Sequence, residues 1–369
     1  MKFICKKSNL MNGVSIVSKA VPNKTTMSIL ECILVDTTKG NITLTANDME
    51  LGIETIIDGD IIEKGIIALD AKIFNDIVRK LPDSEVTVET DSSYKTTITC
   101  EKAKFTIIGK PGDDFSYLPQ IERNDPVIIS QLTLKDVVRQ TIFSIADNDN
   151  NKLMTGELFE ITTDMLKVVS LDGHRISIRN IQLRDSYEHK KVIVPGKTLN
   201  EISKILSGDA DKDVHIYFTD KHIIFEFDET VVVSRLIEGE YFKIDQMLSK
   251  DYETKVTINK KDMLDCIDRS LLLIKEGDKK PIIINITDGS MELKINSTVG
   301  SMNEDIDISK EGKDLMIGFN PKFLIDALKA IDDETVDIYL VNSKAPCFIR
   351  DNDEKYIYLI LPVNFTTVS

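Results

Sequence analysis

The sequence predicts an α+β fold: three similar domains, each with two helices packed on antiparallel sheets. The first observation is a segment that occurs three times, starting at Ile67, Val194 and Gly318. Each copy has a lysine, an apolar helix, an acidic turn and a strand with alternating apolar residues. The second observation is the even spacing of these lysines, which lie 125 residues apart: Lys72, Lys197 and Lys322. This period is the size of a domain and exceeds the roughly 20–50 residues of solenoid repeats.

A second series of helices precedes the first. Apolar residues at helical spacing predict helices over Ser8–Val21, Leu134–Ala146 and Lys260–Ile274. Ser8 is the expected N-cap of the first of these helices, because its hydroxyl can accept a free backbone N–H. Equivalent positions recur after 127 and 126 residues. We therefore expect six helices, two in each domain.

Runs of alternating or β-branched residues predict strands in all three domains. In the first domain they are Ile29–Val35, Asn41–Ala46, Glu50–Ile57, Glu85–Thr90, Lys95–Cys100 and Lys104–Ile108. In the second they are Gly156–Thr162, Leu166–Leu171, Arg175–Ile181, Val214–Phe218, His222–Phe227 and Val231–Leu236. In the third they are Ile282–Thr287, Met291–Asn296, Thr335–Leu340, Cys347–Arg350 and Tyr356–Leu361. The predicted domains are 1–122, 129–250 and 254–369, with polar links between them.

The bulk composition limits the class of protein. The chain has 369 residues, 42% of them hydrophobic, with a net charge of −15. No apolar run approaches the roughly 20 residues of a membrane span, and no secretory signal opens the chain. Five widely spaced cysteines, with no CxxC pair, are expected to be reduced core residues in a cytoplasmic protein. The negative charge argues against simple tight binding to nucleic acid.

A second basic residue follows each repeated lysine after seven positions: Arg79, Lys204 and Lys329. Seven residues are two helical turns, so each basic pair shares one helix face. Acidic residues gather instead in turns and on strands, which predicts a segregation of charge. The alternative for any single lysine is an ordinary solvated helix face. Domains joined head to tail can close into a ring, and helices facing inward would line a central hole with these charges. Duplex DNA in that hole would be held by topology, with weak phosphate contacts.

Motifs along the whole chain resemble the bacterial DNA polymerase III β subunit family, the sliding clamps. After the opening MKF they are TTMSIL at Thr25–Leu30, KLP at Lys80–Pro82, LPQIE at Leu118–Glu122, RQTIFSIA at Arg139–Ala146, LDGHR at Leu171–Arg175, VIVPGKTLNEISKIL at Val192–Leu206, SRLIEG at Ser234–Gly239, DALK at Asp326–Lys329 and LILPV at Leu359–Val363. The resemblance implies a non-catalytic subunit without metal or cofactor. It also implies a head-to-tail homodimer that encircles double-stranded DNA. The implied partners are the replicative polymerase α subunit, the clamp loader δ subunit and repair proteins with clamp-binding motifs, and no membrane.

The resemblance also implies a groove for short peptides rich in Gln, Leu and Phe. By matching motif, its residues are Met154, Leu171, Gly173, His174, Arg175, Ile176, Met247, Asn320, Phe323, Pro346, Ile360, Leu361, Pro362 and Val363. Apolar side chains would anchor the peptide, and Arg175 and Asn320 could meet its polar groups. Three positions depart from the family pattern and put the rim of the groove in question: Phe242, Gln246 and Asn364.

Further positions come from the same resemblance. The dimer interface maps to Phe105, Ile107, Leu272 and Leu273. The alternative, that these four are ordinary core residues, has most weight for Leu272 and Leu273. Lys24, in the loop before TTMSIL, matches a family position that touches DNA.

Two other functions stay open at this point. One is a hydrolase that uses Asp172, His174 and Arg175 as an acid/base cluster, although no P-loop, GxSxG or metal-spacing motif supports it. The other is an interaction scaffold that works without DNA.

Overall fold

The computed structural model describes residues 1–148, 150–274 and 280–365. The last residues of the third predicted domain, 366–369, lie outside the described residues. The chain forms two compact units: unit 1 is Met1–Lys135 with Lys197–Leu236, and unit 2 is Asp136–Gly196 with Ile237–Ser369. The middle predicted domain is thus shared between the two units, and the three domain boundaries stay a prediction.

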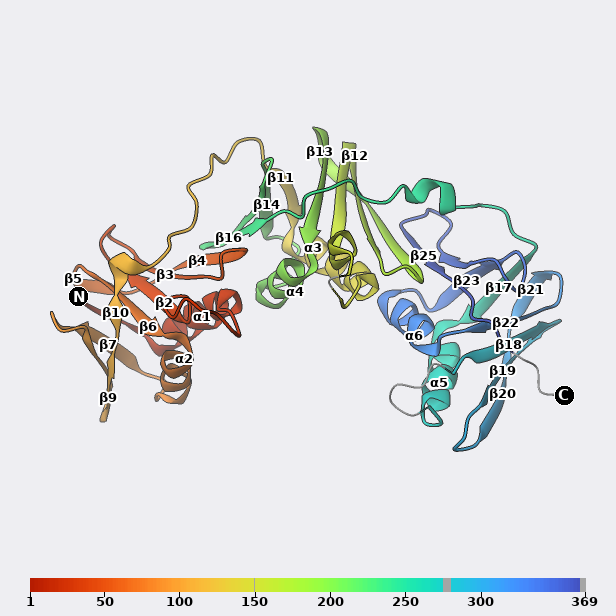
Figure 1. The fold of residues 1–369 in the computed structure, drawn as a ribbon, viewed down its shortest axis with the longest axis horizontal. Coiled ribbons are helices and arrows are strands. Elements are labelled where there is room, and N and C mark those ends of the chain that lie inside the picture. Colours follow the sequence, from red (N-terminus) through yellow and green to blue (C-terminus); the bar gives the residue numbers. More distant parts are fainter. Residues whose placement is uncertain (149, 275–279, 366–369) are drawn as a thin grey trace. The chain divides into compact units, whose positions relative to one another are not determined.

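Six α-helices lie within the described residues, as the sequence predicts (Figure 1). They are α1 (Lys7–Val17), α2 (Ala71–Lys80), α3 (Gln131–Thr141), α4 (Gly196–Ile205), α5 (Lys260–Leu271) and α6 (Pro321–Ala330). Short 3₁₀ turns are η1 (Ser18–Ala20), η2 (Gly112–Asp114), η3 (Ile142–Ser144), η4 (Lys152–Thr155) and η5 (Ile244–Met247). Asp70 caps α2 by accepting the Ile73 N–H at 2.8 Å. Asn320 caps α6, with Pro321 in its first turn, a placement that costs no backbone hydrogen bond.

The predicted N-cap Ser8 is wrong. Helix α1 follows directly from the first strand, so Lys6 takes the N-cap position, and no side chain caps it. The Lys7 N–H donates instead to Ser84 O at 3.0 Å. A neighbouring loop therefore supplies the acceptor that the sequence assigned to a serine hydroxyl.

Unit 1 contains two antiparallel sheets. The five-stranded sheet has the order β5 (Asp60–Glu63), β1 (Lys2–Lys6), β7 (Glu85–Thr90), β8 (Lys95–Cys100) and β9 (Ala103–Ile108). The nine-stranded sheet has the order β10 (Lys110–Pro111), β6 (Ile66–Asp70), β2 (Cys32–Asp36), β3 (Ile42–Asn47), β4 (Leu51–Ile57), β16 (Thr230–Arg235), β15 (His222–Phe227), β14 (Asp213–Phe218) and β11 (Val127–Ser130). Pairing of β4 with β16 joins strands of the first and second predicted domains in one sheet.

Unit 2 is built the same way. Its seven-stranded sheet has the order β12 (Gly156–Leu171), β13 (Arg175–Pro195), β25 (Tyr356–Ile360), β24 (Cys347–Arg350), β23 (Thr335–Leu340), β17 (Thr254–Asn259) and β21 (Ser309–Gly312). Its four-stranded sheet has the order β20 (Ser301–Asp307), β19 (Ser290–Asn296), β18 (Ile282–Thr287) and β22 (Leu315–Phe319). The ladders of both units are antiparallel, which confirms the α+β prediction.

Strand β12 is longer than predicted. The sequence suggested two strands interrupted by polar residues, but the chain runs as one strand to Leu171. A register shift on either side of Thr163, whose φ is +55°, carries the ladder through this stretch. A bulge of this kind adds a residue without ending the pairing. The sequence did not predict the strands β1, β5, β6, β10, β11, β17, β20, β21 and β22.

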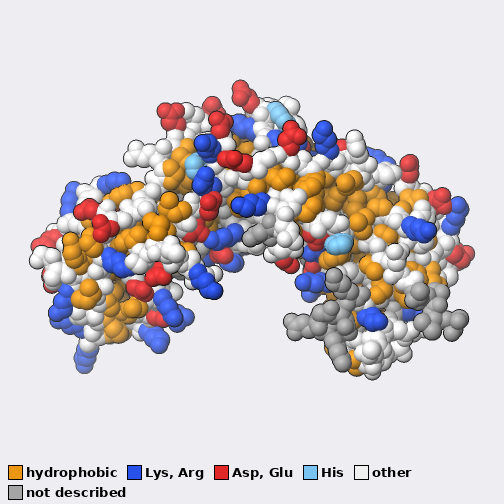
Figure 2. Space-filling view, viewed as in Figure 1, with side chains coloured by type: hydrophobic (Ala, Val, Ile, Leu, Met, Phe, Trp, Pro, Cys, Tyr) orange, Lys and Arg blue, Asp and Glu red, His pale blue; other side chains and the backbone are white. Residues whose placement is uncertain are grey.

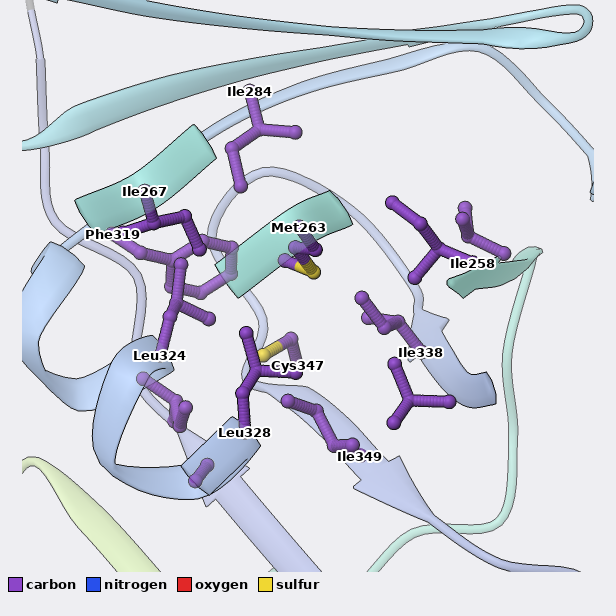
Figure 3. Close-up of a cluster of buried hydrophobic side chains, with 14 of the residues drawn as sticks. Ile258, Met263, Ile267, Ile284, Phe319, Leu324, Leu328, Ile338, Cys347 and Ile349 are labelled. Atoms are coloured by element: carbon purple, nitrogen blue, oxygen red, sulfur yellow. The ribbon is translucent and has the colours of Figure 1, made fainter. Parts of the chain in front are cut away.

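The core of the C-terminal part of unit 2 lies between its helices and sheets (Figure 3). Met263 and Ile267 from α5 and Leu324 and Leu328 from α6 meet strand side chains such as Ile338. Each of these five is at most 4% exposed. Burying one such side chain contributes about 1.5–3 kcal/mol, so this face fixes how the helices lie on the sheets.

All five cysteines are free and buried, as predicted. Burial raises the pKa of the Cys347 thiol to about 12, which keeps it protonated and unreactive at neutral pH. Within the described residues, no helix is both long and apolar enough to cross a membrane.

Candidate functional site

The turn between β12 and β13 is built by one aspartate. Asp172 Oδ1 accepts the backbone N–H groups of His174 at 2.9 Å and Arg175 at 3.1 Å. Gly173 has a φ of +88°, a conformation that glycine adopts without steric cost. This Asp-Gly turn therefore presents His174 at the surface and directs Arg175 inward.

Arg175 connects three segments of unit 2. Its Nη1 donates to Asp326 Oδ2 at 2.7 Å, from α6, and its Nε donates to Asp172 Oδ2 at 2.9 Å. Its Nη2 donates to the carbonyl oxygen of Phe143. The guanidinium also lies over the Phe323 ring, 4.4 Å from the centroid. With 8% of the residue exposed, Arg175 acts chiefly as an internal tie rather than as a free arm for a ligand.

The C-terminal segment joins the same place. Strand β25 pairs with β13, with Arg175 opposite Ile360. Beyond the strand, Leu361 N donates to His174 O at 2.9 Å, and Val363 N donates to Gly318 O at 2.8 Å. The segment is thus held against the start of both β13 and α6 by backbone hydrogen bonds.

The start of α6 supplies the aromatic wall of this site. Asn320 Oδ1 accepts the Lys322 N–H at 3.0 Å, and this cap fixes the first turn. Phe323, on that turn, stacks with His174 at 6.2 Å between ring centroids and 25° between planes. Asn320 and Phe323 therefore reach the site from an element distant in sequence from the β12–β13 turn.

Apolar residues form the floor beneath this turn. Leu171 and Ile176 are buried in one hydrophobic cluster, against which Met154 and Phe242 pack. Leu361 is 38% exposed on the segment that follows β25. Figure 2 shows hydrophobic side chains gathered on the visible face of unit 2. We name this site, the β12–β13 turn, the start of α6 and the segment after β25, the unit 2 groove.

The structure brings most of the fourteen predicted groove residues together. The turn, α6 and C-terminal residues meet through the contacts above, and Pro346 precedes Cys347, which pairs with Ile360. Met247 lies on η5 and is 55% exposed. Of the three departures from the family pattern, Phe242 packs edge-on against Tyr241, with 5.6 Å between ring centroids.

The six repeated basic residues are all exposed. On α2, Lys72 and Arg79 are exposed while Phe74 and Val78 are buried. The same alternation holds on the other two helices, whose exposed basic residues are Lys197 and Lys204 on α4 and Lys322 and Lys329 on α6. Lys24 is exposed as well. In each case the helix buries its apolar face and leaves the basic pair at the surface.

The predicted segregation of charge is wrong in part. Arg79 pairs with Asp76 at 2.9 Å and Lys204 pairs with Glu201 at 2.7 Å, in each case three residues earlier on the same helix. Lys197 forms an ion pair with Asp48 of the β3–β4 turn. Within the described ranges, the structure records no ion pair for Lys322 or Lys329. The basic charge of α2 and α4 is thus partly neutralised, and that of α6 is not.

The four predicted interface residues are not buried. Phe105 is 38% exposed on β9, and Leu272, just after α5, is 81% exposed. Ile107 and Leu273 are partly buried. The alternative that places Leu272 in the core is therefore wrong. A leucine this exposed, and an apolar strand at the end of a sheet, are both typical of surfaces that a partner covers.

Sequence reasoning missed the residues that position others. Asp326 and Phe143 hold Arg175, and Asp48 holds Lys197. Asp326 and Phe143 stand inside the DALK and RQTIFSIA motifs, so motif matching found the segments without their chemistry. Across the part of the chain that the structure describes, no group of three or more His, Cys, Asp or Glu side chains is placed to hold a metal ion.

The fold and site define a class: an α+β protein of repeated antiparallel sheets with outward basic helix faces and a surface groove. Three family models match in succession. They are the DNA polymerase III beta subunit N-terminal domain over residues 1–119, its central domain over 128–243 and its C-terminal domain over 245–364. The chain belongs to the DNA polymerase III β subunit family, the sliding clamps, and its three-domain fold is the clamp fold.

Individual relatives agree with this assignment. The chain is 33% identical to the beta sliding clamp of Staphylococcus epidermidis over 98% of its own length and 99% of that protein. Its fold matches the crystal structure of a putative DNA polymerase III beta subunit from Eubacterium rectale, with a TM-score of 0.96 and 72% identity, covering 99% of this chain and 100% of the other. The sliding clamp of Bacillus subtilis matches with a TM-score of 0.95 and 32% identity, over the same shares.

Proposed function

We propose that two copies of this chain join head to tail, encircle duplex DNA, and hold replication and repair enzymes through the unit 2 groove. The observation that carries this proposal is the threefold recurrence of exposed basic residues on α2, α4 and α6. Lysine and arginine on a helix surface contact phosphates without reading sequence. Such contacts suit a protein that must move along DNA.

The net charge of −15 fits this function. A protein that binds DNA by affinity needs a strong basic footprint, whereas an encircling protein is retained by closure. Ion pairs at Arg79, Lys197 and Lys204 further weaken any fixed phosphate contact. Weak contacts favour sliding.

Strand edges support the head-to-tail dimer. Strand β9 ends the five-stranded sheet of unit 1 and carries exposed Lys104 and Phe105. Strand β20 ends the four-stranded sheet of unit 2 and carries exposed Asp305 and Asp307. Unpaired edges accept a strand from another chain, and the opposite charges favour joining β9 of one copy to β20 of its partner.

The unit 2 groove suits an extended peptide with large apolar side chains. Its apolar floor and the exposed Leu361 offer anchoring contacts, and the His174–Phe323 stack offers an aromatic wall. We assign to this groove the clamp-binding segments of the polymerase α subunit, the clamp loader δ subunit and repair proteins. This role places the chain with the chromosome in the bacterial cytoplasm.

The geometry favours a non-catalytic role over the hydrolase alternative. Asp172 is occupied by two backbone N–H groups and by Arg175, and Arg175 is occupied by Asp326 and a carbonyl oxygen. His174 stacks with Phe323. A general acid or base needs a free partner and a reacting group within reach, and this arrangement uses these side chains to hold the turn.

Retention on circular DNA tests the proposal. A clamp loader would place the labelled protein on a nicked circular plasmid, and gel filtration would separate bound from free protein. We expect the protein to stay with the circle and to leave within minutes once a restriction enzyme linearises it. Retention that is indifferent to linearisation contradicts encirclement, and failure to be retained at all favours the DNA-independent scaffold.

A further inference from the structure

Unit 1 contains a surface pocket of about 310 Å³ that the proposed function does not use. The ends of β4 and β16 form one wall, and the segment Ser116–Pro119 covers it. Met49 and Tyr117, at its mouth, are 53% and 51% exposed. Hydrophobic side chains of this size that stay exposed at a concave site favour an apolar ligand.

The turn beside this pocket repeats the turn of the unit 2 groove. Asp48 Oδ1 accepts the N–H groups of Glu50 at 3.0 Å and Leu51 at 2.6 Å. Asp172 Oδ1 does the same, for His174 at 2.9 Å and for the residue after it. In both places an aspartate shapes the turn that leads into the central strand of the site.

The strand pairing repeats as well. Arg235 N donates to Glu50 O at 2.9 Å at the end of β16, and Leu361 N donates to His174 O at 2.9 Å at the end of β25. Both bonds close an antiparallel pair, β4 with β16 and β13 with β25. The pocket therefore occupies the same place in the repeated architecture as the unit 2 groove.

The covering segment is held in place by its own contacts. Asn47 Nδ2 donates to Ser116 O at 3.2 Å, and Asn47 Oδ1 accepts the Met49 N–H at 2.7 Å. The Leu118 side chain lies directly against Gly52, where any Cβ would collide with it. The pocket is thus formed before a ligand arrives, which lowers the entropy cost of binding.

The charge at the rim is basic and only loosely paired. The Arg235 guanidinium is 51% exposed, and its ion pair with Glu50 is long, at 3.7 Å. Burial, followed by the charges of Arg235 and Lys221, lowers the pKa of His222. A carboxylate that reached Arg235 would meet a positive field in addition to a donor fork that suits two-point binding.

We propose that this pocket, the unit 1 pocket, is a second peptide-docking site, which takes a short extended segment carrying a carboxylate next to large apolar side chains. The apolar side chain enters between Met49 and Tyr117, and the carboxylate binds Arg235. This inference rests on the proposed function, because it extends the peptide binding of the unit 2 groove to its structural counterpart.

Photo-crosslinking tests this site in the full-length protein. The probe is an acetylated, amidated pentapeptide of serine, aspartate, leucine, p-benzoylphenylalanine and serine. Mass spectrometry of the digested protein would locate the crosslinks. We expect crosslinks in residues 47–52 or 116–119, in addition to those in the unit 2 groove. Arg235→Glu should lower the unit 1 yield about fivefold, the effect of losing one surface ion pair. Lys39→Glu, the same charge change at an exposed residue that does not line the pocket, should leave it unchanged.

A second variant separates the two sites. Leu361→Asp should remove crosslinks in the unit 2 groove and leave those in unit 1. Crosslinks confined to the unit 2 groove in the unchanged protein would overturn the second site while leaving the proposed function intact. Crosslinks in neither site at millimolar probe would overturn this inference and the peptide-binding part of the proposed function together.

Discussion

Arg175 Nη1 lies 2.7 Å from Asp326 Oδ2, so the first residue of β13 is tied to α6 across 151 positions of sequence. Both side chains are largely buried, with 9% and 23% exposed. This pair holds the β12–β13 turn against the start of α6. The peptide groove of unit 2 depends on that placement.

Removing the acceptor should destabilise the protein. Asp326→Ala leaves the Arg175 charge in a poorly solvated place, so we expect the free energy of unfolding to fall by about 3 kcal/mol. Urea unfolding followed by circular dichroism measures this as a lower midpoint. The matched control is Asp76→Ala, which breaks the exposed pair with Arg79 and should move the midpoint little. Equal shifts in both variants would contradict the structural role of the Arg175–Asp326 pair.

The basic residues of α6 give the cleanest test of the DNA-facing helices. Lys322 and Lys329 are exposed, and Lys197 is tied to Asp48, so changing Lys197 would also disturb an internal contact. Lys322→Gln with Lys329→Gln should lower the salt slope of DNA retention by about 2, one for each lost phosphate contact. Retention on circular DNA across a KCl series measures this. Dimer formation and groove binding should stay normal, and damage to all three would mean that this helix face is structural.

Stability should fall as pH rises, because of Glu157. Burial raises the pKa of this carboxyl to about 8 from its usual 4.5, although Thr141 opposes the shift. Between these values the folded chain keeps a proton that the unfolded chain has lost. The free energy of unfolding therefore decreases with rising pH by up to about 1.4 kcal/mol per unit and levels off above pH 8.

The matching variant is Glu157→Gln, which keeps the shape and removes the titration. Urea midpoints from pH 5 to pH 9 should lose this component of the slope, and the variant should be the more stable protein at pH 9. Parallel pH profiles for the two proteins would show that Glu157 is ionised or solvated in the folded state.

The exposed apolar residues at the proposed dimer contact should control assembly. Leu272→Asp should weaken the dimer about 10- to 100-fold, since it loses buried apolar area. Analytical ultracentrifugation would show the change from twice the 41.6 kDa chain mass to the single chain. Ile73→Asp, at a residue of α2 that is 48% exposed, is the control and should leave the dimer intact. A dimer unaffected by Leu272→Asp would place the contact elsewhere.

Local patterns explain what the sequence predicted well. Helices α2 and α6 follow from apolar residues at helical spacing, and strands such as β7 and β23 follow from alternation, because both depend on neighbours in the sequence. Strand β1 was missed because its pairing with β5 and β7 depends on distant segments. The Ser8 cap was wrong for the same reason, since a carbonyl from Ser84 takes its place.

The candidate site could be predicted only in outline. Motifs placed Arg175 and Asn320 in the groove, but a pattern cannot show that Arg175 is held by Asp326 and Phe143. Charge patterning likewise predicted exposed lysines and missed the carboxylates that pair with them. These partners lie on other elements or one helical turn away, so only the folded chain shows them together.

The central claim is that the repeated basic residues face a hole that holds duplex DNA. Electron microscopy of the full-length protein bound to a nicked circle, with a gold label on a cysteine placed at Lys329, tests it directly. The account predicts a closed particle with a central opening, DNA passing through it and the label at its inner edge. A particle without an opening, or a label on the outer rim, would contradict it.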